Sequence, residues 1–478
     1  MEPGAATGAG RLIGAQTPEP TGCQDGGEAT PIFDLPLGFP IARGGWGSYV
    51  APTQQRTCLW PSRLRNDVKR SGNRLLAGSF DRFVNYAHRL ESWASNRGRL
   101  GAMTPKIARF LAEHQPATPC LVLDVDRVEE NFRALQRALP LARIYYAVKA
   151  NPAPQVLERL VRLSSFFDAA SYEEVAACLA AGARPEAISY GNTIKKVSAI
   201  RQAHADGVSL FAFDSQEELE KLARHAPGAR VYCRILVENE GADWPLSRKF
   251  GTTVENAKVL MLRAGQMGLD PYGLSFHVGS QQTTTRAYEV AIGKVAMLFT
   301  DLTEAGINLR MMNLGGGFPT RYRDEVPEIE QFGEAITTAM TAHFGNAMPE
   351  MVVEPGRFIV GDAGLVSAEV VLVSRRDPDD PLRWVYLDIG RFGGLAETEG
   401  EAIKYRIVTP HDGTATGPVA IAGPTCDGAD ILYEKSGYRL PLTLACGDRV
   451  SLLATGAYVT TYASQRFNGF APLAEHYL

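Results

Sequence analysis

Short apolar runs alternate with amphipathic segments through the middle of the chain, from about residue 120 to about residue 360. The segments between the runs are rich in Ala, Leu, Glu and Arg and repeat with helical periodicity. The runs are Arg143–Val148, Phe166–Ala170, Ile188–Gly191, Leu210–Asp214, Val231–Ile235, Gly273–Val278, Met311–Leu314 and Met351–Val353. About eight strand–helix units over this length predict an α/β fold, a (β/α)8 or TIM barrel. The alternative is an open doubly wound sheet, which usually has fewer strands and a glycine-rich first turn. Here the first run is followed by Lys-Ala-Asn-Pro.

The pattern changes to β-rich alternation beyond residue 362. Apolar and polar residues alternate in several short runs, which are separated by turn clusters such as 377–381. We therefore predict a barrel over residues 125–361 and a second, β-rich domain made of residues 103–124 and 362–478.

Residues 1–102 form an N-terminal extension outside both predicted domains. Residues 1–30 are rich in Gly, Ala, Pro, Thr and Glu, a composition typical of disorder. Apolar residues recur at helical spacing from about Leu75 to Trp93, which predicts a packed helix. The extension is thus expected to be partly disordered, and its sequence indicates no function.

Composition narrows the possible partners. The chain has 478 residues and a formal net charge of −4, and its basic residues are spread out, so we expect no nucleic-acid partner. No apolar run approaches the roughly 20 residues of a membrane span. The seven cysteines lack zinc-binding or disulfide spacing, which predicts reduced thiols and no metal site. Since the N-terminus also lacks the features of a secretory signal, we expect a cytoplasmic protein.

Polar residues stand where the apolar runs end. In a barrel, all these positions meet at the carboxyl-terminal face, where barrel enzymes place their chemistry. They are Lys149, Asp168, Asn192, Asp214, Arg234, His277, Gly315 to Gly317 and Glu354. Any one of them alone could be a cap or a turn residue, but together they predict an active site.

Lys149 follows an apolar strand, in Tyr-Tyr-Ala-Val-Lys-Ala-Asn-Pro. A buried ammonium is costly unless it is paired or neutralised. Two interpretations are open for the isolated residue: a lysine whose head group reaches solvent, or a Schiff-base lysine with a lowered pKa.

Three further motifs favour the Schiff base. Gly315-Gly316-Gly317 offers backbone N–H groups to a phosphate. A carboxylate and an arginine come from Glu354-Pro-Gly-Arg357, and a planar ring and a hydroxyl from His277-Val-Gly-Ser280. A phosphate-bearing aromatic cofactor could use all of these groups.

Six motifs in order resemble the ornithine/lysine/diaminopimelate decarboxylases, and especially bacterial ornithine-decarboxylase-like enzymes. These are fold-type III enzymes that use pyridoxal 5'-phosphate and have an alanine-racemase-like barrel. The resemblance covers about residues 104–478. The motifs are Tyr146–Pro152, Phe167–Ser171, His277–Gln281, Gly315–Pro319, Glu354–Arg357 and Cys426–Asp430.

The resemblance implies a role for each residue of the predicted cofactor site. Lys149 would carry the cofactor, Glu354 would face the pyridine nitrogen, and His277 would stack on the ring. The other residues implied at the cofactor are Arg234 near it, Asp168 and Glu174 near the lysine, and Ser280, Gly315, Gly316, Gly317, Arg357 and Tyr458 around the phosphate.

The same resemblance implies a homodimer with shared active sites. Cys426, which would protonate the substrate carbon after carbon dioxide leaves, and Asp427 would both reach the partner's barrel. Lys249 and Asp430 would form a salt bridge between subunits. The alternative for the last two is a pair of solvated surface charges.

Asp427 also bears on the substrate. An aspartate here resembles the ornithine and lysine branch, where it would meet a distal ammonium. Glu397 or Glu401 could add a second carboxylate, and Phe467 would line the pocket. Gly428 departs from the serine common at its position, which leaves arginine or another diamino acid open.

The sequence therefore predicts decarboxylation of a basic L-amino acid, most simply ornithine. Ornithine and lysine differ by one methylene, worth only about 1–3 kcal/mol to a pocket. The alternatives are a diaminopimelate decarboxylase and a non-catalytic regulator that keeps the fold. A racemase is possible on the fold alone, but the Cys-Asp motif argues against it.

Overall fold

The computed structural model describes residues 103–244 and 249–478. The predicted extension and its predicted helix lie outside the described residues. No helix within the described ranges is long and apolar enough to cross a membrane.

Eight parallel strands close into a barrel, which confirms the predicted fold class. Neighbours around the ring follow the order β10-β11-β2-β3-β4-β5-β6-β8. The strands are β2 (Ala142–Ala147), β3 (Phe166–Ala169), β4 (Ile188–Tyr190), β5 (Leu210–Phe213), β6 (Arg230–Arg234), β8 (Asp270–Ser275), β10 (Met311–Asn313) and β11 (Glu350–Val353).

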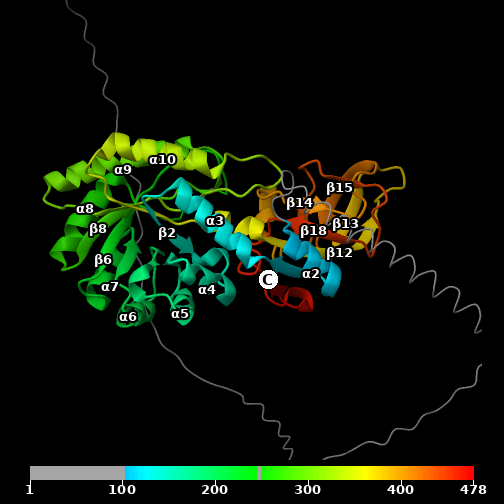
Figure 1. The fold of residues 1–478 in the computed structure, drawn as a ribbon, viewed down its shortest axis with the longest axis horizontal. Helices are drawn as coiled ribbons and strands as arrows, with labels where there is room; N and C mark the ends of the chain where they lie inside the picture. The colour runs from blue at the N-terminus through cyan, green and yellow to red at the C-terminus, as the bar shows by residue number, and fades with distance from the viewer. Residues whose placement is uncertain (1–102, 245–248) are drawn as a thin grey trace, which may run out of the picture. The chain divides into compact units, whose positions relative to one another are not determined.

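Helices connect successive strands and lie outside the ring (Figure 1). They are α3 (Val125–Ala138), α4 (Pro154–Arg162), α5 (Tyr172–Ala180), α6 (Val197–Ala205), α7 (Gln216–His225), α8 (Val254–Gln266), α9 (Arg286–Glu304), α10 (Ile329–Phe344) and the short α11 (Arg357–Val360). Local sequence explains several helix starts: Ser171 and Ser215 each accept a hydrogen bond from the backbone N–H of a glutamate three residues later.

The second domain is a nine-stranded sheet, whose main path is β14-β18-β12-β13-β15-β16. The early strand β1 pairs antiparallel with β12 and parallel with β19, so both ends of the described chain enter this sheet. Its elements are α2 (Pro105–His114), β1 (Cys120–Leu123), β12 (Gly364–Ser374), β13 (Arg383–Leu387), β14 (Arg406–Val408), β15 (Thr416–Ala422), β16 (Ile431–Tyr433), β17 (Arg439–Pro441), β18 (Arg449–Leu453) and β19 (Ala474–Tyr477).

Short elements complete the described chain. The strands β7 (Ala242–Trp244) and β9 (Ser280–Gln282) pair with each other beside the barrel. The 3-10 turns are η1 (Val148–Ala150), η2 (Pro185–Ala187), η3 (Gly361–Ala363), η4 (Ala396–Glu401) and η5 (Phe467–Gly469).

Two large apolar cores follow this division. One fills the space between the barrel strands and their helices, and the other lies against the sheet of the second domain. The domains are joined by hydrogen bonds near the end of β2: Asn151 donates to the Gly456 carbonyl, and the Tyr458 N–H donates to the Ala150 carbonyl. The second domain therefore contacts the segment that carries Lys149.

Two glycines inside helices allow a matched test of this packing. Alanine normally stabilises a helix interior by about 1 kcal/mol relative to glycine. A methyl group at Gly333 in α10 would lie 2.3 Å from the Ala138 carbonyl oxygen of α3, whereas one at Gly293 in α9 would meet only the His343 side chain, at 3.2 Å. We expect Gly333→Ala to lower the melting temperature, because overpacking costs about 1–3 kcal/mol. Gly293→Ala should leave it unchanged or raise it. Equal effects of the two substitutions would contradict the described helix contact.

Candidate active site

Lys149 lies in η1, directly after β2, at the carboxyl-terminal end of the barrel. Its Nζ is 3.4 Å from Oδ2 of Asp168, which lies near the end of the neighbouring strand β3. The Lys149 side chain is 41% exposed, whereas that of Asp168 is buried. Asp168 Oδ1 is buried and has no hydrogen-bond partner among the described residues.

The charges around Lys149 keep its amine protonated in the cofactor-free chain. The surrounding protein lowers the pKa of Lys149, but the negative charge of Asp168, followed by Tyr458, Glu354 and Glu174, outweighs this and raises the pKa above its usual value. The hypothesis of a lowered pKa is therefore wrong for the cofactor-free chain. A proton must leave this ammonium before the amine can form a covalent bond to a carbonyl carbon.

Glu354 follows β11 and is a partly buried carboxylate with an unusual proton affinity. Burial and the nearby charge of Asp168 raise the pKa of Glu354 to about 7, although Lys149 and a hydrogen bond from Asn313 act in the opposite direction. Asn313 Nδ2 donates to Glu354 Oε1, and Asn313 Oδ1 accepts from the Gly315 N–H at 2.9 Å. One amide thus orients both the carboxylate and the glycine loop.

His277 follows β8 and presents a neutral ring. The Gly279 N–H donates to its Nδ1 at 3.0 Å, which leaves the proton of the neutral imidazole on Nε2. Burial, followed by the positive charges of Arg234 and Lys149, holds the pKa of His277 well below its usual value. A flat, uncharged ring is suited to stacking on an aromatic cofactor.

Arg234 ends β6 and also lies at this face. Its guanidinium is 5.5 Å from the centre of the Phe250 ring. Burial lowers the pKa of Arg234, although Glu354 and Asp214 oppose that change. Arg234 therefore remains a cation close to the carboxylates of the site.

The glycine loop after β10 approaches other backbone segments too closely to carry side chains. A Cβ at Gly316 would lie 2.5 Å from the Glu354 carbonyl oxygen, and one at Gly317, where φ is +114°, would lie 2.6 Å from the Gly279 carbonyl oxygen. The N–H groups of Gly316 and Gly317 have no acceptor among the described residues. Two adjacent free N–H groups can bind an anion.

Arg357 is buried beside this loop and contacts both domains. Its Nε and Nη2 donate to Ser280 Oγ at 3.3 and 3.0 Å, and its Nη1 donates to the Tyr322 hydroxyl at 2.6 Å. The guanidinium lies 4.9 Å from the ring centre of Tyr458. The residues predicted around a phosphate thus include a connected group of Ser280, Arg357 and Tyr458.

The two glutamates predicted to meet a substrate ammonium are engaged elsewhere. Glu397 is buried, and its two oxygens accept from Arg357 at 2.5 and 2.8 Å. Glu401 accepts from the backbone N–H groups of residues 434 and 435, at 2.7 Å each, and from the Ser436 hydroxyl. These placements argue against a direct substrate role for either carboxylate, because each is already hydrogen-bonded within the second domain or to Arg357.

Cys426 and Asp427 lie on the exposed loop between β15 and β16. The Cys426 N–H donates to Asn468 Oδ1 at 3.0 Å, and Asp427 Oδ1 accepts from the Ala429 N–H at 2.8 Å. Neither residue contacts Lys149 or its neighbours within the described parts of this single chain. Phe467 packs against Phe392, with ring centres 4.8 Å apart, beside an apolar cavity of about 410 Å³.

Lys249 is exposed, but Asp430 is buried, so the two do not form a pair of solvated surface charges. Asp430 is buried and accepts hydrogen bonds from the Arg391 N–H and from the N–H and hydroxyl of Thr425. The ammonium of the exposed Lys249 lies 4.9 Å from the Phe250 ring centre. Asp430 therefore organises the Cys426 loop within one chain, which argues against a free carboxylate awaiting a partner.

Sequence reasoning missed Asn313 and Gly191. Asn313 is the last residue of β10 and stands two positions before Gly315, and this polar residue at a strand end was a usable signal. A Cβ at Gly191 would overlap Asp168 Oδ1, so only glycine leaves room for that carboxylate. This close approach crosses neighbouring strands and has no signature along the sequence.

A phosphate-bearing pyridine cofactor fits these groups. The site combines an amine, a neutral ring, a carboxylate with a pKa near 7, cationic guanidinium groups and free backbone N–H groups. The buried Oδ1 of Asp168, which has no partner among the described residues, leaves one acceptor of the site unsatisfied. No cluster of metal-binding side chains occurs in the described ranges.

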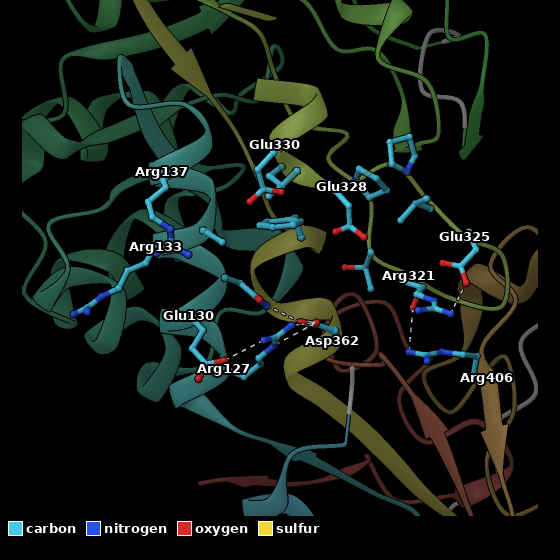
Figure 2. Close-up of a pocket in the computed structure, with 18 residues that line it drawn as sticks. Arg127, Glu130, Arg133, Arg137, Arg321, Glu325, Glu328, Glu330, Asp362 and Arg406 are labelled. Atoms are coloured by element: carbon cyan, nitrogen blue, oxygen red, sulfur yellow. Dashed lines mark hydrogen bonds and ion pairs between the residues drawn. The ribbon is translucent and has the colours of Figure 1, made fainter. Parts of the chain in front are cut away.

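A second cavity, of about 640 Å³, lies away from Lys149, between α3 and the segment before α10 (Figure 2). Arginines and acidic residues make up much of its lining, and some of them pair with one another. Arg127 binds Glu130 and Asp362, and Arg321 binds Glu325, as the dashed lines in Figure 2 mark. This cavity contains none of the predicted site residues.

The raised pKa of Glu354 has a consequence for stability. In the cofactor-free protein, Glu354 is protonated below about pH 7 when folded, but only below 4.5 at its ordinary pKa. The folded chain therefore holds the extra proton between these values, so the contribution of Glu354 to stability falls as the pH rises through this window. We expect wild type to lose free energy of unfolding relative to Glu354→Gln from pH 4.5 to 7 in urea titrations. A difference that is constant with pH would contradict the raised pKa.

Comparisons with known proteins agree with this site. The family model described as "Pyridoxal-dependent decarboxylase, pyridoxal binding domain" matches residues 125–361. The chain is 35% identical to the lysine/ornithine decarboxylase of Selenomonas ruminantium, covering 77% of this chain and 91% of that protein. It is 32% identical to antizyme inhibitor 2 of Xenopus laevis, covering 74% and 79%. A crystal structure of the Vibrio vulnificus lysine/ornithine decarboxylase complexed with cadaverine matches with a TM-score of 0.69 and 31% identity, covering 78% and 97%. These findings confirm the predicted family and cofactor, and the chain belongs to the pyridoxal-dependent ornithine and lysine decarboxylases.

Proposed function

We propose that this protein decarboxylates a basic L-amino acid, ornithine or lysine, to the corresponding diamine and carbon dioxide. The observation that carries the proposal is the meeting of Lys149, Asp168, His277 and Glu354 at one end of a closed barrel. These groups come from four different strand ends. The relatives named for lysine and ornithine decarboxylation support the substrate class.

Bound pyridoxal phosphate would supply an electron sink for the electron pair released when the carboxyl carbon leaves. Lys149 would hold the cofactor, and Asp168 beside it would accept a hydrogen bond or stabilise a positive charge at the amine. His277 would pack its uncharged ring against the cofactor. Ser280, Arg357, Tyr458 and the glycine N–H groups would bind the phosphate.

Glu354 would hold a proton at the pyridine nitrogen. A carboxyl group with a pKa near 7 shares a proton readily with a weak base. Asn313 keeps this carboxyl group in one orientation through its hydrogen bond.

The site would be completed by a second copy of the chain, as a homodimer. Cys426 would deliver a proton to the substrate carbon, and Asp427 would bind the distal ammonium of the substrate. Support comes from the position of both residues on an exposed loop without contacts to the chain's own Lys149. The adjacent apolar cavity, lined by Phe392, Phe467 and Phe470 among others, is a surface that a second copy could cover.

A non-catalytic regulator is the second candidate, which the likeness to antizyme inhibitor 2 favours. Against it stands the complete set of Lys149, His277, Glu354 and Cys426. Diaminopimelate decarboxylation is a third possibility, for which Asp427 is the less suitable residue.

We place the enzyme in the cytoplasm, a proposal supported by five unpaired cysteines in the described chain.

A substrate panel separates these candidates. We expect the purified protein to release carbon dioxide from ornithine or lysine faster than from arginine, diaminobutyrate or diaminopimelate. Activity should fall below detection in Lys149→Ala, because the covalent link to the cofactor is lost. Preference for diaminopimelate, or full turnover by Lys149→Ala, would contradict the proposal. A wild-type protein that does not bind pyridoxal phosphate would support the regulator.

Mixing two inactive variants tests the shared site. Cys426→Ala should lose about a hundredfold or more in turnover, because a positioned proton donor is removed. When Lys149→Ala and Cys426→Ala subunits exchange freely, half of the dimers are mixed, and each holds one intact site. Activity should then recover to about one quarter of wild type. No recovery, despite subunit exchange verified by mass, would show that Cys426 acts on its own subunit.

A further inference from the structure

A buried ion pair of Arg357 and Glu397 joins the two domains. Arg357 begins α11 of the barrel, whereas Glu397 lies in η4 of the second domain. Their side chains are only 3% and 5% exposed. Separating such a pair would leave one charge buried without compensation, which is strongly unfavourable.

The pair uses one edge of the guanidinium and leaves the other for the cofactor site. The Nη1 and Nη2 groups donate to the two oxygens of Glu397 in a bidentate arrangement. The Nε and Nη2 groups form the second edge, and both converge on Ser280 Oγ. Since the guanidinium is planar, fixing the first edge also fixes the direction of the second.

The contacts of Tyr322 and Tyr458 with Arg357 constrain the orientation of the guanidinium less than Glu397 does. The Tyr322 hydroxyl accepts a hydrogen bond from Nη1 alone, at 2.6 Å, so it contacts the guanidinium at one nitrogen only. The rings of Tyr322 and Tyr458 lie 5.7 and 4.9 Å from the guanidinium carbon and provide flat surfaces rather than directional bonds. Glu397 is therefore the partner that holds the guanidinium through two separate acceptor atoms.

We propose that Glu397 is a positioning residue for the phosphate of the cofactor: it holds Arg357 so that the Nε and Nη2 edge faces Ser280 and the phosphate beside it. The inference rests on the proposed function, because it assigns the phosphate to this corner of the site. It also gives the second domain a part in cofactor retention, through η4. Glu397 would act through Arg357 and would not touch the substrate.

The test compares binding of pyridoxal phosphate with binding of pyridoxal, which lacks the phosphate. Dissociation constants of both compounds are measured on cofactor-free wild type, Glu397→Gln and Glu399→Gln, together with melting temperatures. Glu399 is the matched control, since it lies in the same 3-10 turn but is 66% exposed and pairs at the surface with Arg391.

We expect Glu397→Gln to weaken pyridoxal phosphate binding about tenfold or more, the effect of losing one well-directed charge-assisted hydrogen bond. Pyridoxal binding should change less than about twofold, since Glu397 reaches the cofactor only through the phosphate contact. Glu399→Gln should match wild type for both compounds.

Three results would overturn the inference. Equal weakening for both compounds would indicate a general structural role, and unchanged binding would indicate none. Tighter binding of pyridoxal phosphate would show that Glu397 competes with the phosphate for Arg357. If Glu397→Gln does not fold, Glu397→Asp, which keeps the charge but shortens the reach, takes its place with the same outcomes. Wild type that fails to bind pyridoxal phosphate would refute the proposed function instead.

Discussion

The charges at the mouth of the barrel must balance one another. Lys149, Asp168, Arg234 and Glu354 stand close together at this end, and burial of any of these charges without a partner would be costly. The raised pKa of Glu354 and the lowered pKa of His277 both follow from this shared balance. A cofactor that brings a phosphate dianion and a basic ring nitrogen would enter a site in which Glu354 can already gain or lose a proton near pH 7.

Barrel closure makes this balance possible. Lys149 and Glu354 are about two hundred residues apart along the chain, yet β11 pairs directly with β2. The second domain then adds its own constraints from one side, through the Tyr458 N–H on the Ala150 carbonyl and through Glu397 on Arg357. Site geometry therefore depends on how the two domains pack, and not on the barrel alone.

Apolar periodicity located the barrel because buried parallel strands are short and nearly continuous in apolar residues. The run Phe166–Ala170 corresponds to β3, and Lys149 stands two residues beyond the end of β2. Motif order then indicated the family. By contrast, the partners of Glu397 and Glu401 could not be predicted, because hydrogen bonds between distant loops leave no periodic signal. A resemblance to relatives likewise could not show that Asp430 accepts hydrogen bonds from Thr425 of its own loop and from the Arg391 N–H.

The most direct measurement is mass spectrometry of the protein after incubation with pyridoxal phosphate and reduction with borohydride. Reduction makes the link between an amine and the cofactor permanent, so the modified lysine can be located in a peptide digest. The account predicts one cofactor per chain, attached to the peptide that contains Lys149, and none in Lys149→Ala. Attachment to another lysine in wild type, or no attachment at saturating cofactor, would contradict it.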